Sequence, residues 1–233
     1  MLVNEVIILC GGLGTRFQGV STEIPKVLAP IEENVTFLDI LFHRLQEVGI
    51  TRYILCVGHL SEQIITFVKE RYNKLEVVFS IESNPLGTGG AVKQALLLAK
   101  GSNIIVLNGD SLCSVNLLQL VDSHVQHNAL VTLTTVEIEN TVDYGSIVAK
   151  ADKIIEFKEK QPGKGLINAG IYVISKAITK YFPTVDKFSL ENLFTELVKT
   201  NNVYCYKTDS TMLDIGTPER YKLVKHILEY SFI

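Results

Sequence analysis

The segment near the N-terminus combines closely spaced glycines with two cations, a combination suited to binding phosphate groups. Three glycines lie within Gly11–Gly14, directly after the apolar run 6–10, and Arg16 and Lys26 follow them. Ligands of α/β sheets bind beyond the carboxyl ends of the strands, and glycine lets the backbone approach a phosphate closely and turn its N–H groups toward it. A guanidinium adds a planar fork for phosphate oxygens. We therefore expect a phosphate-binding loop here.

This loop matches neither of two common phosphate-binding patterns. Phe17 stands where the pattern G-x-G-x-x-G needs its third glycine, and no Gly-Lys-Ser or Gly-Lys-Thr follows. From the glycines alone, a tight turn without a ligand is the competing interpretation. Arg16 and the Pro25-Lys26 pair favour the phosphate interpretation, because a plain turn needs neither cation.

Two aspartates at strand ends indicate a metal site. Asp110 follows the apolar run 104–107 and the pair Asn108-Gly109, and Asp214 lies in the segment LDIGTP. Mg²⁺ typically takes one or two carboxylates and completes its shell with phosphate oxygens and water, so this pair would be sufficient. For either residue alone, an aspartate that only caps a turn is the competing interpretation.

Two further segments carry polar groups where a ligand could bind. The segment ESNPLGTGGA at 82–91 follows an apolar run and opens a helix, which suits the polar edge of a nucleotide or its phosphates. A capped helix start without a ligand is the alternative. The charged segment EFKEK at 156–160 has the composition of a solvated strand end, and composition alone favours that interpretation.

The elements that must position these residues alternate in type through the first half of the chain. Apolar runs typical of buried strands lie at 6–10, 53–57, 77–81 and 104–107. Helical periodicity covers 36–48, 61–72, 91–99 and 116–127. We expect Thr36 and Asn116 to cap two of these helices, Gln119 to complete a capping box, and Gly49 to end the first helix. Four such β-then-α units predict a parallel sheet with helices on both faces.

The second half predicts a different arrangement. Its strand candidates are short or alternating, which indicates added antiparallel or mixed strands at 130–138, 146–149, 153–157 and 170–174. Helices are expected at 189–199 and 217–230. Because no linker, repeat or low-complexity tract divides the 233 residues, we expect a single domain over 1–233.

Composition and charge narrow the classes of partner. A formal net charge of -3 gives no global basic field, which argues against nucleic acid or a membrane surface as a partner. The four cysteines are widely separated without a CxxC pair, so we expect small hydrophobic side chains rather than disulfides or a zinc site. The apolar run at 6–10 is too short for a signal peptide, and no run approaches a membrane span. A cytoplasmic location is the expectation.

Taken together, the motifs resemble one family. GGLGTR, followed after a short spacer by PK, is similar to the signature of the sugar-1-phosphate nucleotidylyltransferases, and the segments PLGTGGA, NGD, FKEK, INAGIY, FSLE and DIGTPE follow in that family's order. The resemblance implies an α/β fold of the nucleotide-diphospho-sugar transferase type, a Rossmann-like three-layer sandwich with a mixed, mostly parallel central sheet. It also implies a nucleotide-binding half at about 1–115 and a sugar-binding half at about 116–233.

The resemblance assigns roles to individual residues. It implies that the nucleotide is held by Cys10, Gly11, Gly12, Gly14, Thr15, Arg16, Glu82, Gly87, Thr88 and Asp110. It implies that the sugar phosphate is held by Lys26, Gly145, Glu159, Lys160, Asn168 and Gly170. The catalytic residues would be Arg16, Lys26 and Asp110, and the catalytic Mg²⁺ would be held by Asp110 and Asp214.

The implied reaction is attack of a sugar 1-phosphate on the α-phosphorus of a nucleoside triphosphate, with release of pyrophosphate. The order of motifs favours GTP and D-glycero-D-manno-heptose 1-phosphate, for surface polysaccharide synthesis. Transfer to mannose 1-phosphate, or uridylyl or cytidylyl transfer to another sugar phosphate, is the alternative, because the chain departs from the usual pattern at Phe17-Gln18, Glu23, Val27-Leu28 and Ala169. A non-catalytic nucleotide-sugar sensor is the alternative of another class. Strand edges in the second half are compatible with a homodimer.

Overall fold

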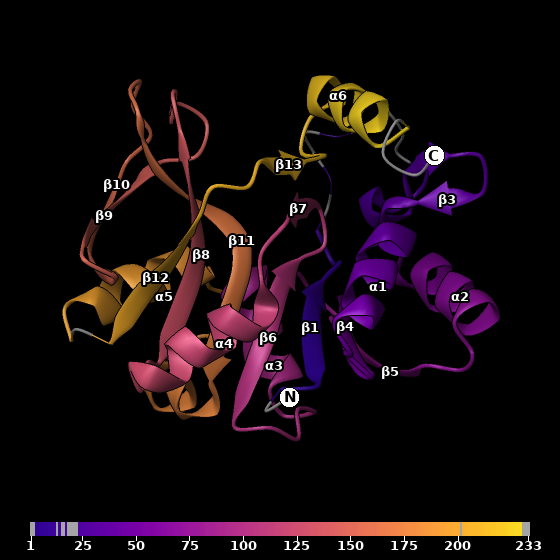
Figure 1. The fold of residues 1–233 in the computed structure, drawn as a ribbon. Helices are drawn as coiled ribbons and strands as arrows, with labels where there is room; N and C mark the ends of the chain where they lie inside the picture. Colours follow the sequence, from indigo (N-terminus) through magenta and orange to yellow (C-terminus); the bar gives the residue numbers. More distant parts are fainter. Residues whose placement is uncertain (1–2, 13, 15–16, 18–22, 201, 230–233) are drawn as a thin grey trace.

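The computed structural model describes residues 3–12, 14, 17, 23–200 and 202–229, and a nine-stranded sheet runs through both halves of this part of the chain (Figure 1). In spatial order its strands are β5 (Glu76–Ile81), β4 (Arg52–Val57), β1 (Glu5–Leu9), β6 (Asn103–Asn108), β11 (Gly165–Ser175), β8 (Val131–Ile138), β12 (Val203–Thr208), β10 (Lys153–Lys158) and β9 (Ser146–Lys150). Strands β10 and β11 run opposite to the other seven. The sheet is therefore mixed and mostly parallel, as expected.

Helices cover both faces of this sheet. One apolar core joins the sheet to α1 (Phe37–Glu47), α2 (Ser61–Arg71), α4 (Leu117–Gln126) and α6 (Pro218–Glu229). A second core on the other face joins it to α3 (Gly87–Ala95) and α5 (Leu190–Val198) (Figure 1). Along β1, Val6 and Ile8 enter the first core and Ile7 the second, which is why the strand is apolar without interruption. The three-layer expectation is confirmed.

Local sequence signals determine where the helices begin and end. Thr36 accepts a hydrogen bond from the backbone N–H of Asp39, whose carboxylate accepts one from the backbone N–H of Thr36, so α1 starts with a complete capping box. The helix stops before Gly49, which has a φ of 82°. Asn116 and Ser189 cap α4 and α5 through their side chains. These helix starts agree with the sequence predictions.

Two helix predictions were wrong, for tertiary reasons. Gln119 does not complete a capping box: its side-chain oxygen accepts a hydrogen bond from the Tyr206 hydroxyl at 2.7 Å. Helix α3 begins at Gly87 rather than at Ala91. Its glycines are packing positions, since a Cβ on Gly90 would lie 2.1 Å from the backbone oxygen of Asp186. From the sequence these glycines indicated a turn, because the sequence does not show that the segment around Asp186 packs against them.

The second half curls back on itself. Strand β11 begins at Gly165, five residues before the predicted start, and a bulge between Asn168 and Tyr172 separates its two parts. The first part pairs with β9 through Leu166 and Ile147 as well as with β8. Strand β9 therefore has a strand partner on both sides at Ile147, which narrows the free edge that a homodimer could use. The homodimer stays a prediction.

One strand of the sheet and two small sheets were not predicted. Strand β12 lies parallel to β8, with Val203 and Cys205 buried in the second core. Strands β7 (Ser111–Cys113) and β13 (Met212–Asp214) form an antiparallel pair, and β2 (Pro30–Glu32) pairs with β3 (Val35–Thr36). The β7–β13 pair matters for function, because it places the segment after Asp214 beside Asp110: the Ile215 N–H donates to the Asp110 carbonyl.

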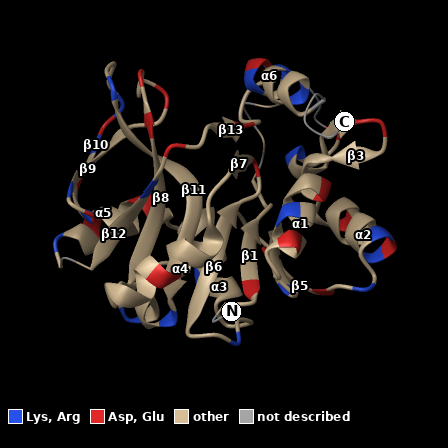
Figure 2. Cartoon of the chain, viewed as in Figure 1, with Lys and Arg blue, Asp and Glu red and all other residues tan. Residues whose placement is uncertain are grey.

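Charge is spread over the helices and loops in both signs, and the central strands β6, β8 and β11 carry little of it (Figure 2). All four cysteines are buried and free, as expected. Among the residues described, no helix is long and apolar enough to cross a membrane.

Candidate active site

The carboxyl end of β6 places Asp110 beside Lys26. Gly109 permits this approach: its N–H donates to the Leu9 carbonyl at 3.0 Å, and a Cβ on it would lie 2.6 Å from that same oxygen. Lys26 begins a short 3-10 turn after Pro25, and its ammonium forms an ion pair with Oδ2 of Asp110. The other oxygen, Oδ1, accepts a hydrogen bond from the Ser111 hydroxyl at 3.0 Å. A predicted cation and a predicted carboxylate are thus brought together.

Asp214 is held by several donors. Its carboxylate accepts hydrogen bonds from the Tyr144 hydroxyl at 2.6 Å, from the Gly216 N–H at 2.8 Å and from the Arg220 guanidinium at 3.2 Å. The same guanidinium donates to Asp143 at 2.6 Å and lies 4.6 Å from the centre of the Tyr144 ring. Burial and the hydrogen bond to Asp214 raise the pKa of Tyr144, so its hydroxyl remains a donor. These contacts join α6, β13 and the loop before β9.

The carboxylates of Asp110 and Asp214 are of the ligand type that a magnesium ion takes. Across the β7–β13 ladder Asp214 is paired in register with Ser111, and Asp110 directly precedes Ser111 in the turn between β6 and β7, so the two aspartates lie at neighbouring positions. Within the described residues no group of three or more metal-binding side chains forms a cage. Mg²⁺ needs no such cage, because it commonly uses one or two carboxylates together with phosphate oxygens and water.

The first glycine loop packs directly against Glu82. A Cβ on Gly11 would lie 2.7 Å from Oε1 of Glu82 and 3.2 Å from the backbone nitrogen of Gly58, so a side chain there would displace the Glu82 carboxylate and crowd Gly58. Glu82 accepts a hydrogen bond from the Leu86 N–H at 3.0 Å, and burial raises the pKa of its carboxyl group. Cys10, just before the loop, is buried, and burial together with the charge of Asp110 raises the pKa of its thiol. Gly11 is therefore in contact with Glu82, and Cys10 precedes it on the side of Gly109.

The second glycine loop is tied to the start of α5. Gly87 has a φ of 70°, and a Cβ on it would lie 2.6 Å from the Phe188 carbonyl oxygen. That oxygen accepts a hydrogen bond from the Gly89 N–H at 2.9 Å. The Thr88 hydroxyl accepts one from the Leu190 N–H, also at 2.9 Å. Thr88 is exposed, and its oxygen has a structural partner that the sequence did not indicate.

A cavity of about 460 Å³ collects most of the residues predicted for the sugar phosphate. Gly145, Glu159, Lys160 and Asn168 line it. The Asn168 side chain is oriented by two contacts, since its oxygen accepts from the Gly170 N–H at 2.9 Å and its amide donates to the Tyr172 hydroxyl at 2.8 Å. Gly170 does not line the cavity: it lies in the bulge of β11, where a Cβ would meet Asn108. Lys26 is not among the lining residues either.

Some predicted residues lie outside the described part of the chain. Thr15 and Arg16 belong to this group, so their places relative to Asp110 stay predictions. Gly12 and Gly14 are described; Gly14 has a φ of 60°, and Gly12 is exposed. Phe17, the departure from the glycine pattern, is buried and packs edge-to-face on Tyr221 of α6 at 5.5 Å. Its role in the structure is therefore packing.

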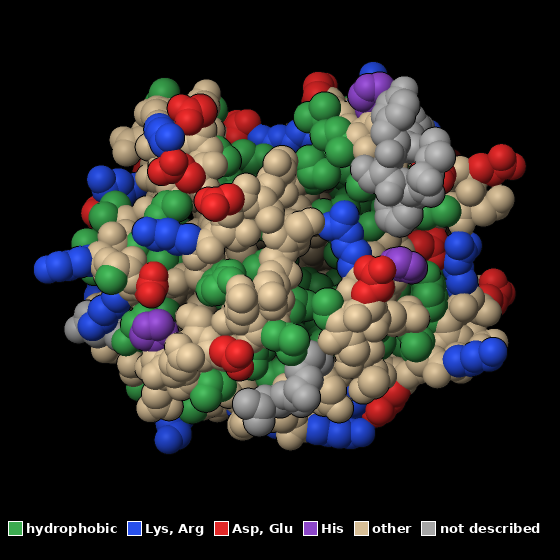
Figure 3. Space-filling model, in the orientation of Figure 1, with side chains coloured by type: hydrophobic (Ala, Val, Ile, Leu, Met, Phe, Trp, Pro, Cys, Tyr) green, Lys and Arg blue, Asp and Glu red, His purple; other side chains and the backbone are tan. Residues whose placement is uncertain are grey.

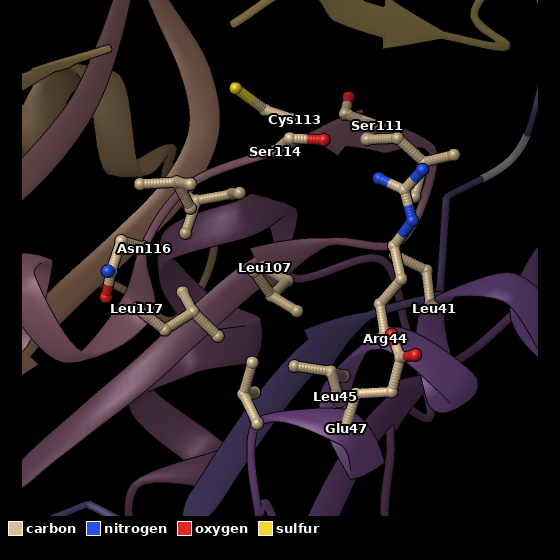
Figure 4. A pocket seen from close by; sticks show the side chains of 14 residues that line it. Leu41, Arg44, Leu45, Glu47, Leu107, Ser111, Cys113, Ser114, Asn116 and Leu117 are labelled. Atoms are coloured by element: carbon tan, nitrogen blue, oxygen red, sulfur yellow. The ribbon is translucent and has the colours of Figure 1, made fainter.

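A second cavity, of about 430 Å³, lies between α1 and α4 and holds none of the predicted site residues. Hydrophobic side chains form the floor of a hollow on this face of the molecule (Figure 3). Leu107 lies at its base, and Arg44 and Glu47 of α1 lie at one side (Figure 4). Ser111, whose hydroxyl donates to Asp110, belongs to its wall.

Sequence reasoning missed Tyr144 and Arg220. Tyr144 lines the 460 Å³ cavity and also donates a hydrogen bond to Asp214, so it joins this cavity to that carboxylate. Tyr144 directly precedes Gly145, which was predicted to bind the sugar phosphate, and this position could have indicated a residue of the same site. Arg220 follows Asp214 by six residues, and nothing in that spacing showed that its guanidinium would turn back to the carboxylate.

The fold and the arrangement of these residues define a nucleotidyl transferase, and the chain belongs to the Nucleotidyl transferase family, whose model it matches over residues 5–229. It is 36% identical over 228 residues to the D-glycero-alpha-D-manno-heptose 1-phosphate guanylyltransferase of Aneurinibacillus thermoaerophilus, with 97% of this chain and 99% of the relative covered. The enzyme of the same name from Campylobacter jejuni is 37% identical over 219 residues, with 93% and 96% covered.

A solved structure supports the same relationship. HddC from Yersinia pseudotuberculosis, complexed with GMP-PN, matches with a TM-score of 0.85 and 34% identity, over 97% of this chain and 99% of that one. The predicted family and the predicted fold type are confirmed by these comparisons.

Proposed function

We propose that the protein transfers a guanylyl group from GTP to D-glycero-α-D-manno-heptose 1-phosphate, forming GDP-heptose and pyrophosphate. Relatives of that name are 36% and 37% identical to this chain over nearly its whole length. The structural observation that carries the proposal is the position of Tyr144, which lines the cavity and donates to Asp214. A sugar phosphate in that cavity would lie next to the carboxylates at the ends of the strands.

The reaction needs no general base. An oxygen of the sugar 1-phosphate is already an anion, and it forms a new bond to the α-phosphorus of GTP while the bond from that phosphorus to the bridging β-phosphate oxygen breaks. The leaving pyrophosphate keeps the electron pair of that bond. The barrier comes mainly from repulsion between negative charges and from alignment, so cations and fixed N–H donors supply the catalysis.

Different residues of this chain would bind the triphosphate, the sugar phosphate and the metal ion. We assign the binding of the triphosphate to the backbone N–H groups of the first glycine loop and to Arg16, and the binding of the sugar and its phosphate to Glu159 and Lys160. The Lys26 ammonium, held beside Asp110, would meet the phosphate oxygens as charge moves toward the pyrophosphate. Asp110 and Asp214 would hold Mg²⁺, which when bound neutralises phosphate charge and orients the reacting groups.

A pyrophosphate-release assay tests the proposal directly. GTP, ATP, UTP, CTP and dTTP are each combined with heptose 1-phosphate, mannose 1-phosphate and glucose 1-phosphate, and the product is identified by mass. We expect release with GTP and heptose 1-phosphate to exceed every other pair. Preference for mannose 1-phosphate or for another nucleotide would assign a different substrate within the same reaction. No release with any pair would favour a nucleotide-sugar sensor.

The cellular setting is part of the same proposal. The product would serve the synthesis of surface polysaccharides, and the reaction would take place in the cytoplasm. Four buried free cysteines are compatible with a reducing compartment.

A further inference from the structure

The wall of the 460 Å³ cavity opposite the predicted sugar motifs is one side of helix α5. Four polar residues of this helix line the cavity: Glu191, Asn192, Thr195 and Glu196. Their spacing places them on one side of a helix, and all four are exposed while Leu190, Leu193, Phe194 and Leu197 are buried in the core. We call these four residues the α5 polar face.

The start of α5 is hydrogen-bonded to the second glycine loop, which we assign to the nucleotide. The N-terminal end of α5 is therefore the end nearer the nucleotide. The Leu190 N–H donates to the Thr88 hydroxyl, and the Phe188 carbonyl accepts from the Gly89 N–H. Glu196 lies six residues beyond Leu190, or about 9 Å along the helix axis at 1.5 Å per residue. A sugar whose phosphate meets the nucleotide must direct its other end away from this loop. Thr195 and Glu196 are therefore placed beside the part of the sugar farthest from the reacting phosphate.

The chemistry of this face suits hydroxyl groups. A carboxylate accepts hydrogen bonds from two neighbouring hydroxyls, and an amide both donates and accepts. The Thr195 hydroxyl donates to the Glu191 carbonyl at 2.9 Å, so its oxygen remains an acceptor. Both oxygens of Glu196 accept from Lys199 at 2.7 and 2.8 Å, and each carboxylate oxygen can accept a further hydrogen bond. Within the described chain, no hydrogen bond or ion pair occupies the side chains of Glu191 and Asn192. The opposite wall carries the cations Lys158 and Lys160, so the phosphate and the hydroxyl groups have separate partners.

We propose that Asn192, Thr195 and Glu196 select sugar 1-phosphates that carry a longer exocyclic chain, by hydrogen bonding to the C7 hydroxyl that a heptose has and a hexose lacks. The inference rests on the proposed function and extends it to the residues that determine the sugar. Mannose 1-phosphate is the matched comparison, because it has the same ring configuration and lacks the C7 hydroxymethyl group.

The test is a set of enzyme variants assayed with the two sugars. Asn192→Ala, Thr195→Val and Glu196→Gln are each assayed with GTP and saturating Mg²⁺, and kcat/KM is measured for heptose and for mannose 1-phosphate. We expect each change to lower the heptose value about five- to tenfold, as for the loss of one hydrogen bond, and to leave the mannose value within about twofold. Glu70→Gln, an exposed change on α2, is the control and should alter neither value. Equal loss for both sugars, or no loss for either, would overturn the proposal.

A binding measurement separates this inference from the function itself. The same sugar phosphates are titrated into wild type and variants by calorimetry without nucleotide. Tighter binding of the heptose, weakened in the variants, supports the selection even if no guanylyl transfer is found. Equal binding of both sugars by wild type, or no binding of either, would contradict it.

Discussion

Lys26 and Asp110, 84 residues apart in the sequence, form an ion pair between the 3-10 turn after Pro25 and the carboxyl end of β6. Their side chains are 18% and 33% exposed, so the pair is partly buried and remains open to a ligand on one side. The Ser111 hydroxyl fixes the second oxygen of Asp110. An ammonium and an oriented carboxylate thus stand together at the strand ends, where a phosphate would bring negative charge.

Replacing Asp110 by Asn should abolish most of the activity without unfolding the protein. The substitution keeps the shape and the contact with Ser111 but removes the charge that pairs with Lys26 and that would hold Mg²⁺. We expect kcat to fall about a hundredfold or more, in line with the loss of one electrostatic group from an active site. The melting temperature should stay within a few degrees of wild type. The measurement is pyrophosphate release together with thermal unfolding.

The matched control for this prediction is Asp122→Asn, which changes an exposed aspartate on α4. It should keep the wild-type rate. Near-normal turnover of a folded Asp110→Asn variant would contradict the metal assignment.

Removing the Tyr144 hydroxyl should affect the sugar phosphate more than the nucleotide. Tyr144→Phe keeps the ring beneath Arg220 and loses the 2.6 Å hydrogen bond to Asp214. We expect the free energy of unfolding to fall by about 1 kcal/mol and the KM for the sugar 1-phosphate to rise severalfold, because the loop beside Gly145 loses its anchor. The KM for GTP should change little. Kinetics with each substrate varied in turn would decide, and a rise confined to GTP would contradict the assignment.

Gly12→Ala separates a binding role from a structural one. No described atom lies within 4 Å of a Cβ built on Gly12, and its φ is not in the left-handed region. The change should therefore leave the free energy of unfolding within about 0.5 kcal/mol of wild type. If the loop approaches a triphosphate closely, the methyl group will raise the KM for GTP at least tenfold.

Gly87→Ala is the contrasting variant, because its Cβ would lie 2.6 Å from the Phe188 carbonyl oxygen at a φ of 70°. It should lose stability as well as affinity for GTP. An unchanged KM for GTP in Gly12→Ala would remove that residue from the phosphate loop.

The sequence predicted the parallel part of the fold well because each of its signals is local. Buried strands such as β1 are apolar on both faces, and Thr36 finds its capping partner three residues away. The site residues at strand ends were predictable for the same reason, since the ends of parallel strands meet at one edge. The family resemblance then ordered the motifs and assigned the sugar phosphate to Glu159 and Lys160, which composition alone would have left as a solvated strand end. Both residues line the 460 Å³ cavity, and their role stays a prediction.

The missed features depend on contacts between distant segments. Strand β12 alternates Val203 and Cys205 with two tyrosines, yet only its insertion beside β8 makes it a strand of the sheet. The turn of Arg220 toward Asp214 and the binding of Gln119 to Tyr206 are choices among competing polar partners. Local propensity does not determine such choices, because they depend on which segments the tertiary fold brings together.

Acid should destabilise the protein through His124, which is buried on α4. Its Nδ1 lies 3.0 Å from the Thr132 hydroxyl, Nε2 has no partner within the described chain, and burial lowers its pKa from 6.5 to about 4. Below pH 6.5 the His124 imidazole is protonated in the unfolded chain, whereas in the folded protein it is protonated only near pH 4. Stability contributed by the neutral ring is therefore present above pH 6.5 and lost progressively down to pH 4, by about 3 kcal/mol in total.

Urea unfolding of wild type and His124→Asn at intervals from pH 7.5 to 4 measures this loss. Asparagine retains a polar partner for Thr132 but does not titrate in this range. The difference between the two proteins at pH 7.5 gives the cost of the substitution itself, since the histidine is neutral there in both states. We expect the variant to lose about 3 kcal/mol less than wild type between pH 6.5 and 4. Parallel pH profiles for the two proteins would show that His124 is not the group responsible.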